Sequence, residues 1–143
     1  MLEAAKAFIY EGSHLLLQLR DDKPDIFYPN HWGLFGGTVD EGETPTEAMQ
    51  RELEEEIGWT PPELKFLLKC EELDFPCISY IFAAPLTVDL GKLQLTEGQA
   101  FGMFTLDELA TLLLVPSLPL LLPQVLEVID SAELIASWQS LAP

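Results

Sequence analysis

Residues 37–59 have the sequence GTVDEGETPTEAMQRELEEEIGW. Thr44 fits the N-cap of a helix, because Pro45 follows at the first helical position and Glu47 stands where its carboxylate can reach back to the cap. Gly58 fits the C′ position, at which helices commonly end. The stretch therefore predicts a short, well-capped helix between Thr44 and Gly58.

The predicted helix has an apolar face next to an acidic one. The apolar residues recur every four positions: Met49, Leu53 and Ile57. The acidic residues stand at i, i+3 and i+4 and so share one side: Glu52, Glu55 and Glu56. Like charges at this spacing destabilise a helix by roughly a few tenths of a kcal/mol per pair, and a bound cation reverses that effect. Because hard cations take oxygen ligands, we expect a divalent-metal site whose position the apolar face fixes.

The composition is that of a globular and strongly acidic chain. Hydrophobic residues make up 48% of its 143 residues, enough for a core, and the length fits a single domain over 1–143. Against 24 acidic residues stand only 7 Lys and Arg, giving a formal net charge of −17. Nucleic-acid binding by counterion release is therefore excluded, because the basic surface it needs is missing. A small anionic substrate would need metal ions to offset its charge.

The remaining composition favours a cytoplasmic protein without a membrane segment. Cys70 and Cys77 are the only cysteines, and such isolated cysteines are predicted to be free thiols. The N-terminus lacks a basic region followed by an apolar one, so no secretory signal is predicted. The leucine-rich segment 112–122 is shorter than the roughly 20 residues of a membrane span and contains prolines. We expect it to pack on the core.

Hydrophobic patterning predicts strands before and after the helix. The expected strands are 4–10, 14–19, 64–73, 78–86 and 101–104, and 92–95 is either a short strand or part of a loop. A short helix is expected over 107–114 and a longer one over 120–135. The sum is an α/β (α+β) domain, in which a mixed or antiparallel sheet carries the acidic helix on one face and the C-terminal helix on the other.

The segment before the paired glycines is predicted to form part of a substrate pocket. Residues 20–30 are rich in Asp, Pro and Asn and so indicate a loop. Arg20 either binds a phosphate bidentately or forms a surface ion pair with a neighbouring aspartate. Trp32 either lines the pocket or packs in the core. Gly36 and Gly37 permit a close approach of the backbone to a ligand.

The acidic helix and its flanks resemble the signature of a known enzyme family. The pattern is G-x5-E-x7-R-E-U-x-E-E-x-G-U, where U is bulky and apolar, and it is matched by Gly37, Glu43, Arg51, Glu52, Leu53, Glu55, Glu56, Gly58 and Trp59. The chain thus resembles the Nudix hydrolases. The resemblance implies a Nudix-type α/β/α sandwich that hydrolyses a nucleoside diphosphate linked to another group X, with Mg²⁺ or Mn²⁺ as cofactor.

The resemblance also implies roles for individual residues. Glu52, Glu55 and Glu56 handle metal and water, the main-chain carbonyl of Gly37 is a further ligand, and Arg51 orients Glu43. Phosphoanhydride hydrolysis needs cations on the phosphate oxygens and an oriented water, which clustered carboxylates can supply.

The sequence does not decide which carboxylate is the general base. Glu55 and Glu56 are expected as direct ligands, whereas Glu52 is either a third ligand or the proton acceptor. Glu97 is a second candidate base, because TEGQ resembles a loop that supplies such a glutamate in triphosphate-cleaving relatives. Glu71 and Glu72 are weaker alternatives.

The substrate is less closely specified than the reaction. Phe35 occupies a place where many relatives carry proline and is expected to shape the entrance of the substrate pocket. We expect a nucleoside triphosphate or a related nucleotide, with ADP-ribose or a nucleotide sugar as the alternative. A catalytically silent, ligand-sensing Nudix module is the alternative of another class. The leucine-rich C-terminal segment either docks on the domain's own sheet or forms a homodimer.

Overall fold

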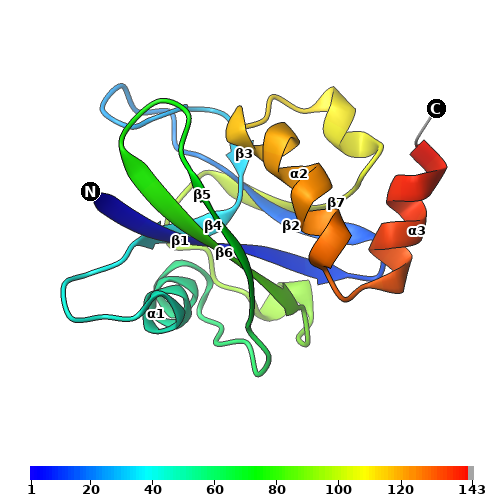
Figure 1. Cartoon of the computed structure of the whole chain (residues 1–143), viewed down its shortest axis with the longest axis horizontal. Helices are drawn as coiled ribbons and strands as arrows, with labels where there is room; N and C mark the ends of the chain where they lie inside the picture. The colour runs from blue at the N-terminus through cyan, green and yellow to red at the C-terminus, as the bar shows by residue number, and fades with distance from the viewer. Residues whose placement is uncertain (142–143) are drawn as a thin grey trace.

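In the computed structural model, which describes residues 1–141, one mixed seven-stranded sheet lies between helices on its two faces (Figure 1). In chain order the strands are β1 (Leu2–Glu11), β2 (His14–Leu19), β3 (Trp32–Gly33), β4 (Phe35–Thr38), β5 (Lys65–Glu71), β6 (Cys77–Pro85) and β7 (Ala100–Thr105). The helices are α1 (Pro45–Ile57), α2 (Ser117–Val128) and α3 (Ala132–Leu141), with 3₁₀ turns at Leu90–Lys92 and Glu108–Thr111. The predicted α+β sandwich is confirmed.

The sheet divides around β1. One edge of β1 pairs in parallel with β6 along most of its length. The other edge pairs antiparallel with β4 over residues 4–7 and with β2 over residues 9–11. Strand β2 in turn pairs with β3 near its end and with β7 along its other edge. The short strands β3 and β4 therefore fill the gap that opens where β1 and β2 diverge, and the paired glycines lie in that gap.

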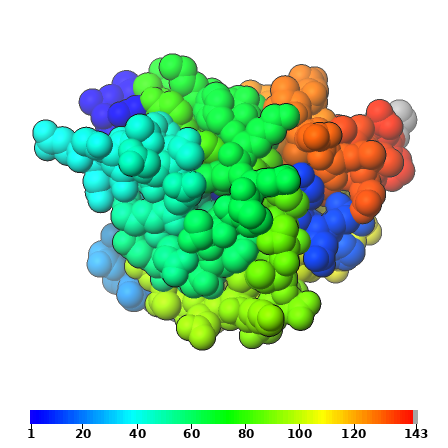
Figure 2. All heavy atoms as spheres, turned by 90° about the horizontal axis from the view of Figure 1, so that it is seen from below, coloured from blue at the N-terminus to red at the C-terminus, as the bar shows by residue number. Residues whose placement is uncertain are grey.

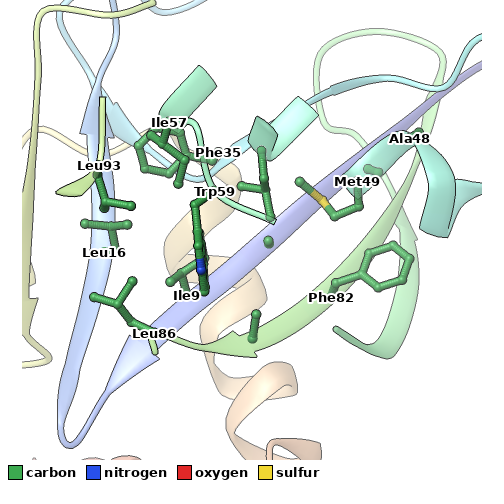
Figure 3. Packing of buried hydrophobic residues seen from close by; sticks show 14 residues of the cluster. Ile9, Leu16, Phe35, Ala48, Met49, Ile57, Trp59, Phe82, Leu86 and Leu93 are labelled. Carbon is green, nitrogen blue, oxygen red and sulfur yellow. The ribbon is translucent and has the colours of Figure 1, made fainter. Parts of the chain in front are cut away.

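Side chains alternate along β1 between two separate cores. Ala5, Ala7 and Ile9 belong to the cluster beneath α1, whereas Phe8 belongs to the cluster beneath α2. Figure 3 shows the first cluster, in which Met49 and Ile57 of the helix lie over side chains of the sheet. Figure 2 shows the molecule from the α1 side, where the chain leading into the helix projects outward. This packing holds α1 at the gap in the sheet.

Helix α1 begins and ends as its sequence predicts. The backbone N–H of Glu47 donates to Thr44 Oγ1 at 3.1 Å, and the backbone N–H of Thr44 donates to Glu47 Oε1 at 2.9 Å. Gly58 ends the helix in the left-handed region, with φ 66°, a conformation that costs glycine little. Met49, Leu53 and Ile57 are fully buried.

The secondary structure differs from the prediction in the C-terminal helices and in two short strands. The single helix expected over 120–135 is two helices, because Ile129 is extended and Ser131 Oγ accepts from the backbone N–H of Leu134, which starts a new helix. The helix expected over 107–114 is only a 3₁₀ turn at Glu108–Thr111. Of the two alternatives for 92–95, the strand is not formed and the loop is observed. Strands β3 and β4 were not predicted, because strands of two and four residues give too little alternation to recognise.

Two further predictions concern the cysteines and the leucine-rich segment. Cys70 and Cys77 are free thiols, as predicted. Leucines 118, 121 and 122 are buried in the core between α2 and the sheet. Within residues 1–141, no helix has the length and apolar character needed to cross a membrane.

Candidate active site

The acidic face of α1 lies directly against the glycine pair of β4. Glu56 is almost fully buried, at 2% exposure. Its Oε1 accepts from the backbone N–H of Gly36 at 3.1 Å, and its Oε2 accepts from Gln18 Nε2 at 3.4 Å. A Cβ atom at Gly36 would collide with the carbonyl oxygen of Ala5, and one at Gly37 with the carboxyl group of Glu52. The backbone of Ala5 thus excludes any side chain at Gly36, whereas a side chain at Gly37 would displace the carboxyl group of Glu52.

Arg51 links the other glutamates. Its Nε and Nη2 donate to the two carboxylate oxygens of Glu43 at 2.7 and 3.0 Å, a bidentate pair. Its Nη1 donates to Glu52 Oε1 at 2.9 Å and to Glu55 Oε2 at 3.3 Å. Hydrogen bonding by Arg51 holds the pKa of Glu43 below its usual range. The Arg51–Glu43 contact that the family resemblance implies is therefore present, and its orienting role stays a prediction.

Burial and mutual repulsion of the carboxylates raise their pKa values at this site. Burial, and then the charges of Glu52 and Glu97, raise the pKa of Glu56 to about 8, although the Gly36 N–H and Gln18 act in the opposite direction. Burial also raises the pKa of Glu52 despite its bond to Arg51. Both shifts have the same origin, because negative charges are held together out of water. A cation at this position would relieve that repulsion and displace the proton from Glu56.

The donor atoms fit a hard divalent cation. Carboxylates from α1 and a main-chain carbonyl are the oxygen ligands that Mg²⁺ and Mn²⁺ prefer. Among residues 1–141, however, no three His, Cys, Asp or Glu side chains are gathered closely enough to hold a metal ion. Glu52 and Glu55 instead contact Arg51. The predicted ligands Gly37, Glu52, Glu55 and Glu56 would therefore hold a metal only after these glutamates turn from the guanidinium, and the metal site stays a prediction.

A loop brings Glu97 toward the same site. The backbone N–H of Thr96 donates to the carbonyl of Glu56 at 2.9 Å, and that of Gln94 donates to the carbonyl of Ile57 at 3.0 Å. These bonds tie the loop to the last turn of α1. Glu97 itself is exposed and close enough to raise the pKa of both Glu52 and Glu56. Its predicted role as base is compatible with this position.

Glu54 lies apart from the other helix glutamates. It is exposed, and its Oε2 accepts from Thr60 Oγ1 at 2.8 Å.

Gln18 contacts Glu56 and was not indicated by the sequence. A lone glutamine in an apolar strand carries no motif, and only the folded sheet places it beside Glu56.

A cavity of about 300 Å³ adjoins the carboxylate site. Gly36 and Gly37 line it, and so does Arg20, whose Nε donates to the carbonyl of Phe27 at 2.8 Å. Burial lowers the pKa of Arg20, and the nearby charge of Glu56 acts in the opposite direction. A guanidinium is still fully charged at neutral pH. Arg20 thus lines the cavity and lies close enough to Glu56 for their charges to interact, which is compatible with the phosphate contact that was one of its two predicted roles.

Two predicted substrate contacts have other positions. Phe35 is fully buried in the core beneath α1, so its side chain does not shape the pocket entrance, and that prediction was wrong (Figure 3). Strand β4 is pleated, and its alternation turns this side chain to the helix. Trp32 packs edge-on against Phe104, with ring centroids 4.9 Å apart, and is not among the residues that line the cavity. Trp32 was predicted either to line the pocket or to pack in the core, and the structure shows packing.

The fold and the site together define a Nudix-type domain. The family model described as the NUDIX domain matches residues 2–125. The chain belongs to this family.

Comparison with individual proteins gives matches of two kinds. A nucleoside triphosphatase NudI of Escherichia coli O139:H28 is 42% identical over 48 residues, which are 34% of this chain and 33% of that protein. The chain thus spans about a third of the length of the curated relatives it matches. A MutT NUDIX hydrolase from Burkholderia pseudomallei superposes with a TM-score of 0.72 at 25% identity, covering 87% of this chain and 97% of that one.

A second similar structure shares only the fold at this level of identity. It is the NUDIX domain of Shewanella oneidensis NrtR complexed with ADP ribose, with a TM-score of 0.73 at 19% identity, covering 89% of this chain and 87% of that one.

The buried Glu56 predicts an unusual dependence of stability on pH. Its pKa is raised from 4.5 to about 8, so the folded protein keeps a proton that the unfolded chain releases. This contribution to stability is complete below pH 4.5 and is lost as the pH rises through 8. In metal-free buffer, we expect the free energy of unfolding to fall over this window by about 1.4 kcal/mol per pKa unit. Urea denaturation in EDTA at a series of pH values measures it.

Glu56→Gln is the matched control, because glutamine cannot ionise and the slope should flatten. Added Mg²⁺ should stabilise the wild type most above pH 8, where no proton competes for the carboxylate. Equal slopes in wild type and variant would show that Glu56 is not the group responsible.

Proposed function

We propose that this chain is a divalent-metal-dependent hydrolase that cleaves a phosphoanhydride bond in a nucleoside diphosphate linked to X. The observation that carries this proposal is the meeting of a buried carboxylate site and a cavity at one glycine pair. Gly36 donates to Glu56, Gly37 contacts Glu52, and both glycines line the cavity. A substrate bound in the cavity can therefore present its phosphates to the glutamates.

In this proposal, Glu55, Glu56 and the Gly37 carbonyl would hold Mg²⁺ or Mn²⁺, and Glu52 would be either a further ligand or the proton acceptor. The metal would neutralise phosphate charge and make bound water more acidic. A water molecule attacks phosphorus, the bridging P–O bond breaks, and a carboxylate accepts the proton of the water. Glu97, exposed on its loop, and Glu52 are the two candidates for this base. Arg51 holds Glu43 bidentately and so keeps the entry to α1 in place.

A nucleoside triphosphate is the preferred substrate class. The relative with 42% identity over 48 residues is a nucleoside triphosphatase. Arg20, one of the chain's 7 Lys and Arg residues, lines the cavity of this otherwise acidic protein, which favours a phosphate group beside its guanidinium. ADP-ribose is the alternative, supported by the likeness to the NrtR domain that binds it. A nucleotide sugar and a silent ligand-sensing module are further alternatives.

A substrate panel tests the proposal. The purified protein is incubated with Mg²⁺ and with nucleoside triphosphates, ADP-ribose or nucleotide sugars, and the products are identified by ³¹P NMR. We expect turnover of a triphosphate to a monophosphate and pyrophosphate, or to a diphosphate and phosphate. Saturable binding of one panel member without turnover would favour the silent module, and preference for ADP-ribose would favour the alternative substrate.

Arg20→Met should raise the KM for the triphosphate about 10- to 100-fold, since a charge-assisted hydrogen bond contributes roughly 1.5–3 kcal/mol. Lys23→Met is the matched control, because Lys23 lies on the same loop with its side chain 63% exposed. Steady-state kinetics measure both variants. Equal KM values for the two would contradict a phosphate contact by Arg20.

A further inference from the structure

An ion pair lies in the wall of the cavity that adjoins the glutamate site. Lys6 Nζ donates to Glu72 Oε1 at 2.5 Å, and Ser79 Oγ donates to the same oxygen at 2.6 Å. The side chain of Glu72 is only 8% exposed and that of Lys6 27% exposed. Both residues line the cavity, in which most of the other lining side chains are apolar. Charges withdrawn from water in this way are costly unless they are paired.

The pair retains hydrogen-bonding capacity toward the cavity. Both bonds to Glu72 fall on Oε1, and its Oε2 accepts none from the part of the chain that the structure describes. No buried polar side-chain atom in that part lacks a partner, so Oε2 is accessible. The ammonium of Lys6 has three donors, of which Glu72 takes one. The wall therefore presents a free acceptor beside free donors.

Glu72 is an acceptor only. Burial raises its pKa, but hydrogen bonds from Lys6 and Ser79 outweigh that effect, and the pKa is lowered overall. The carboxylate is thus ionised at neutral pH and repels a second anion. A group that approaches Glu72 Oε2 must carry an N–H or O–H.

Two aromatic rings stand at the same cavity. Phe27 of the loop after β2 and Phe75 of the β5–β6 connection stack with centroids 4.5 Å apart and planes 18° from parallel. Both line the cavity, and Phe27 is 55% exposed. Exposed aromatic faces stack favourably on flat heterocycles. The cavity therefore combines flat apolar surfaces with one donor–acceptor pair.

We propose that Lys6 and Glu72 select the uncharged planar heterocycle of the substrate, when it lies in this cavity, by an edge on which an acceptor stands beside an N–H. This inference rests on the proposed function and names the part of the substrate that the site recognises. Lys6 donates to the carbonyl or ring nitrogen of that edge, and Glu72 Oε2 accepts from the neighbouring N–H. A site built to pair with an N–H rejects analogues that lack it, because its own polar groups are then left unpaired.

Nucleosides test this without hydrolysis, because they have no phosphate to cleave. Binding of guanosine, adenosine, cytidine and uridine to the metal-free protein is measured by isothermal titration and ¹⁵N NMR. At least one nucleoside should bind, and its analogue methylated on the edge nitrogen should bind at least about tenfold more weakly. The analogue requires no mutation, so the test does not depend on a variant that folds.

Glu72→Gln should weaken binding of the same nucleoside about tenfold or more, since a charge-assisted bond becomes a neutral one. Asp74→Asn is the matched control, because Asp74 is an exposed carboxylate in the same hairpin and does not line the cavity. Equal affinity for methylated and unmethylated nucleosides would overturn the inference even if the protein hydrolyses nucleotides. Selective nucleoside binding without any turnover would uphold it and contradict the proposed hydrolysis.

Discussion

Glu56→Gln is expected to lower kcat/KM for the nucleotide substrate by at least about a hundredfold, a loss of the size seen when one preorganised charged group is removed from an active site. The substitution keeps the shape of the side chain. Glutamine can still accept from the Gly36 N–H, which bonds Glu56 Oε1 at 3.1 Å. It cannot ionise, however, and so gives up the charge that a metal ion would neutralise. Initial rates at saturating Mg²⁺ measure the loss.

Glu54→Gln is the control for this experiment. Glu54 lies on the same helix, carries the same charge and bonds Thr60 outside the site. This variant should keep activity within about twofold of wild type, because surface substitutions away from special features have small effects. If Glu56→Gln retained a near-wild-type rate, Glu56 would be excluded as an essential ligand.

Phe35→Ala is expected to lower the free energy of unfolding by about 3–5 kcal/mol, the usual cost of removing a large aromatic side chain from a core. Phe35 has no exposed surface and packs among residues of α1 and the sheet (Figure 3). For a domain of this size the loss should lower Tm by roughly 10 °C. Chemical and thermal denaturation measure both quantities.

Phe35→Leu separates packing from substrate contact. Leucine fills much of the same volume, so Phe35→Leu should cost far less stability than Phe35→Ala. The variant still removes the aromatic ring, and with it any contact that the ring could make with a substrate. If Phe35→Leu raised the KM tenfold with Tm unchanged, Phe35 would have to touch the substrate, contrary to its buried position.

The acidic helix could be predicted from the sequence because its signals are local. The cap residues, the apolar stripe and the terminal glycine all lie within residues 37–59, and each acts on its neighbours a few positions away. The α/β/α arrangement followed from the strands and helices on either side. The contact between Arg51 and Glu43 was expected only through the family resemblance.

Other features depend on long-range pairing that local patterns do not carry. Gln18 reaches Glu56 across 38 residues, and Lys6 reaches Glu72 across 66. Phe35 was placed at the pocket because it precedes the glycines, whereas the pleat of β4 turns it into the core. A sequence places residues near each other along the chain, but the face on which each one lies depends on strand register.

The proposed function requires that the α1 glutamates support metal-dependent attack of water on a phosphoanhydride. The most direct test is hydrolysis of the nucleotide panel in H₂¹⁸O by the wild-type protein, with mass spectrometry of the products. We predict that one phosphate-containing product gains ¹⁸O when Mg²⁺ is present and that none does in EDTA. Absence of the label from every product of folded, Mg²⁺-treated protein would contradict the claim.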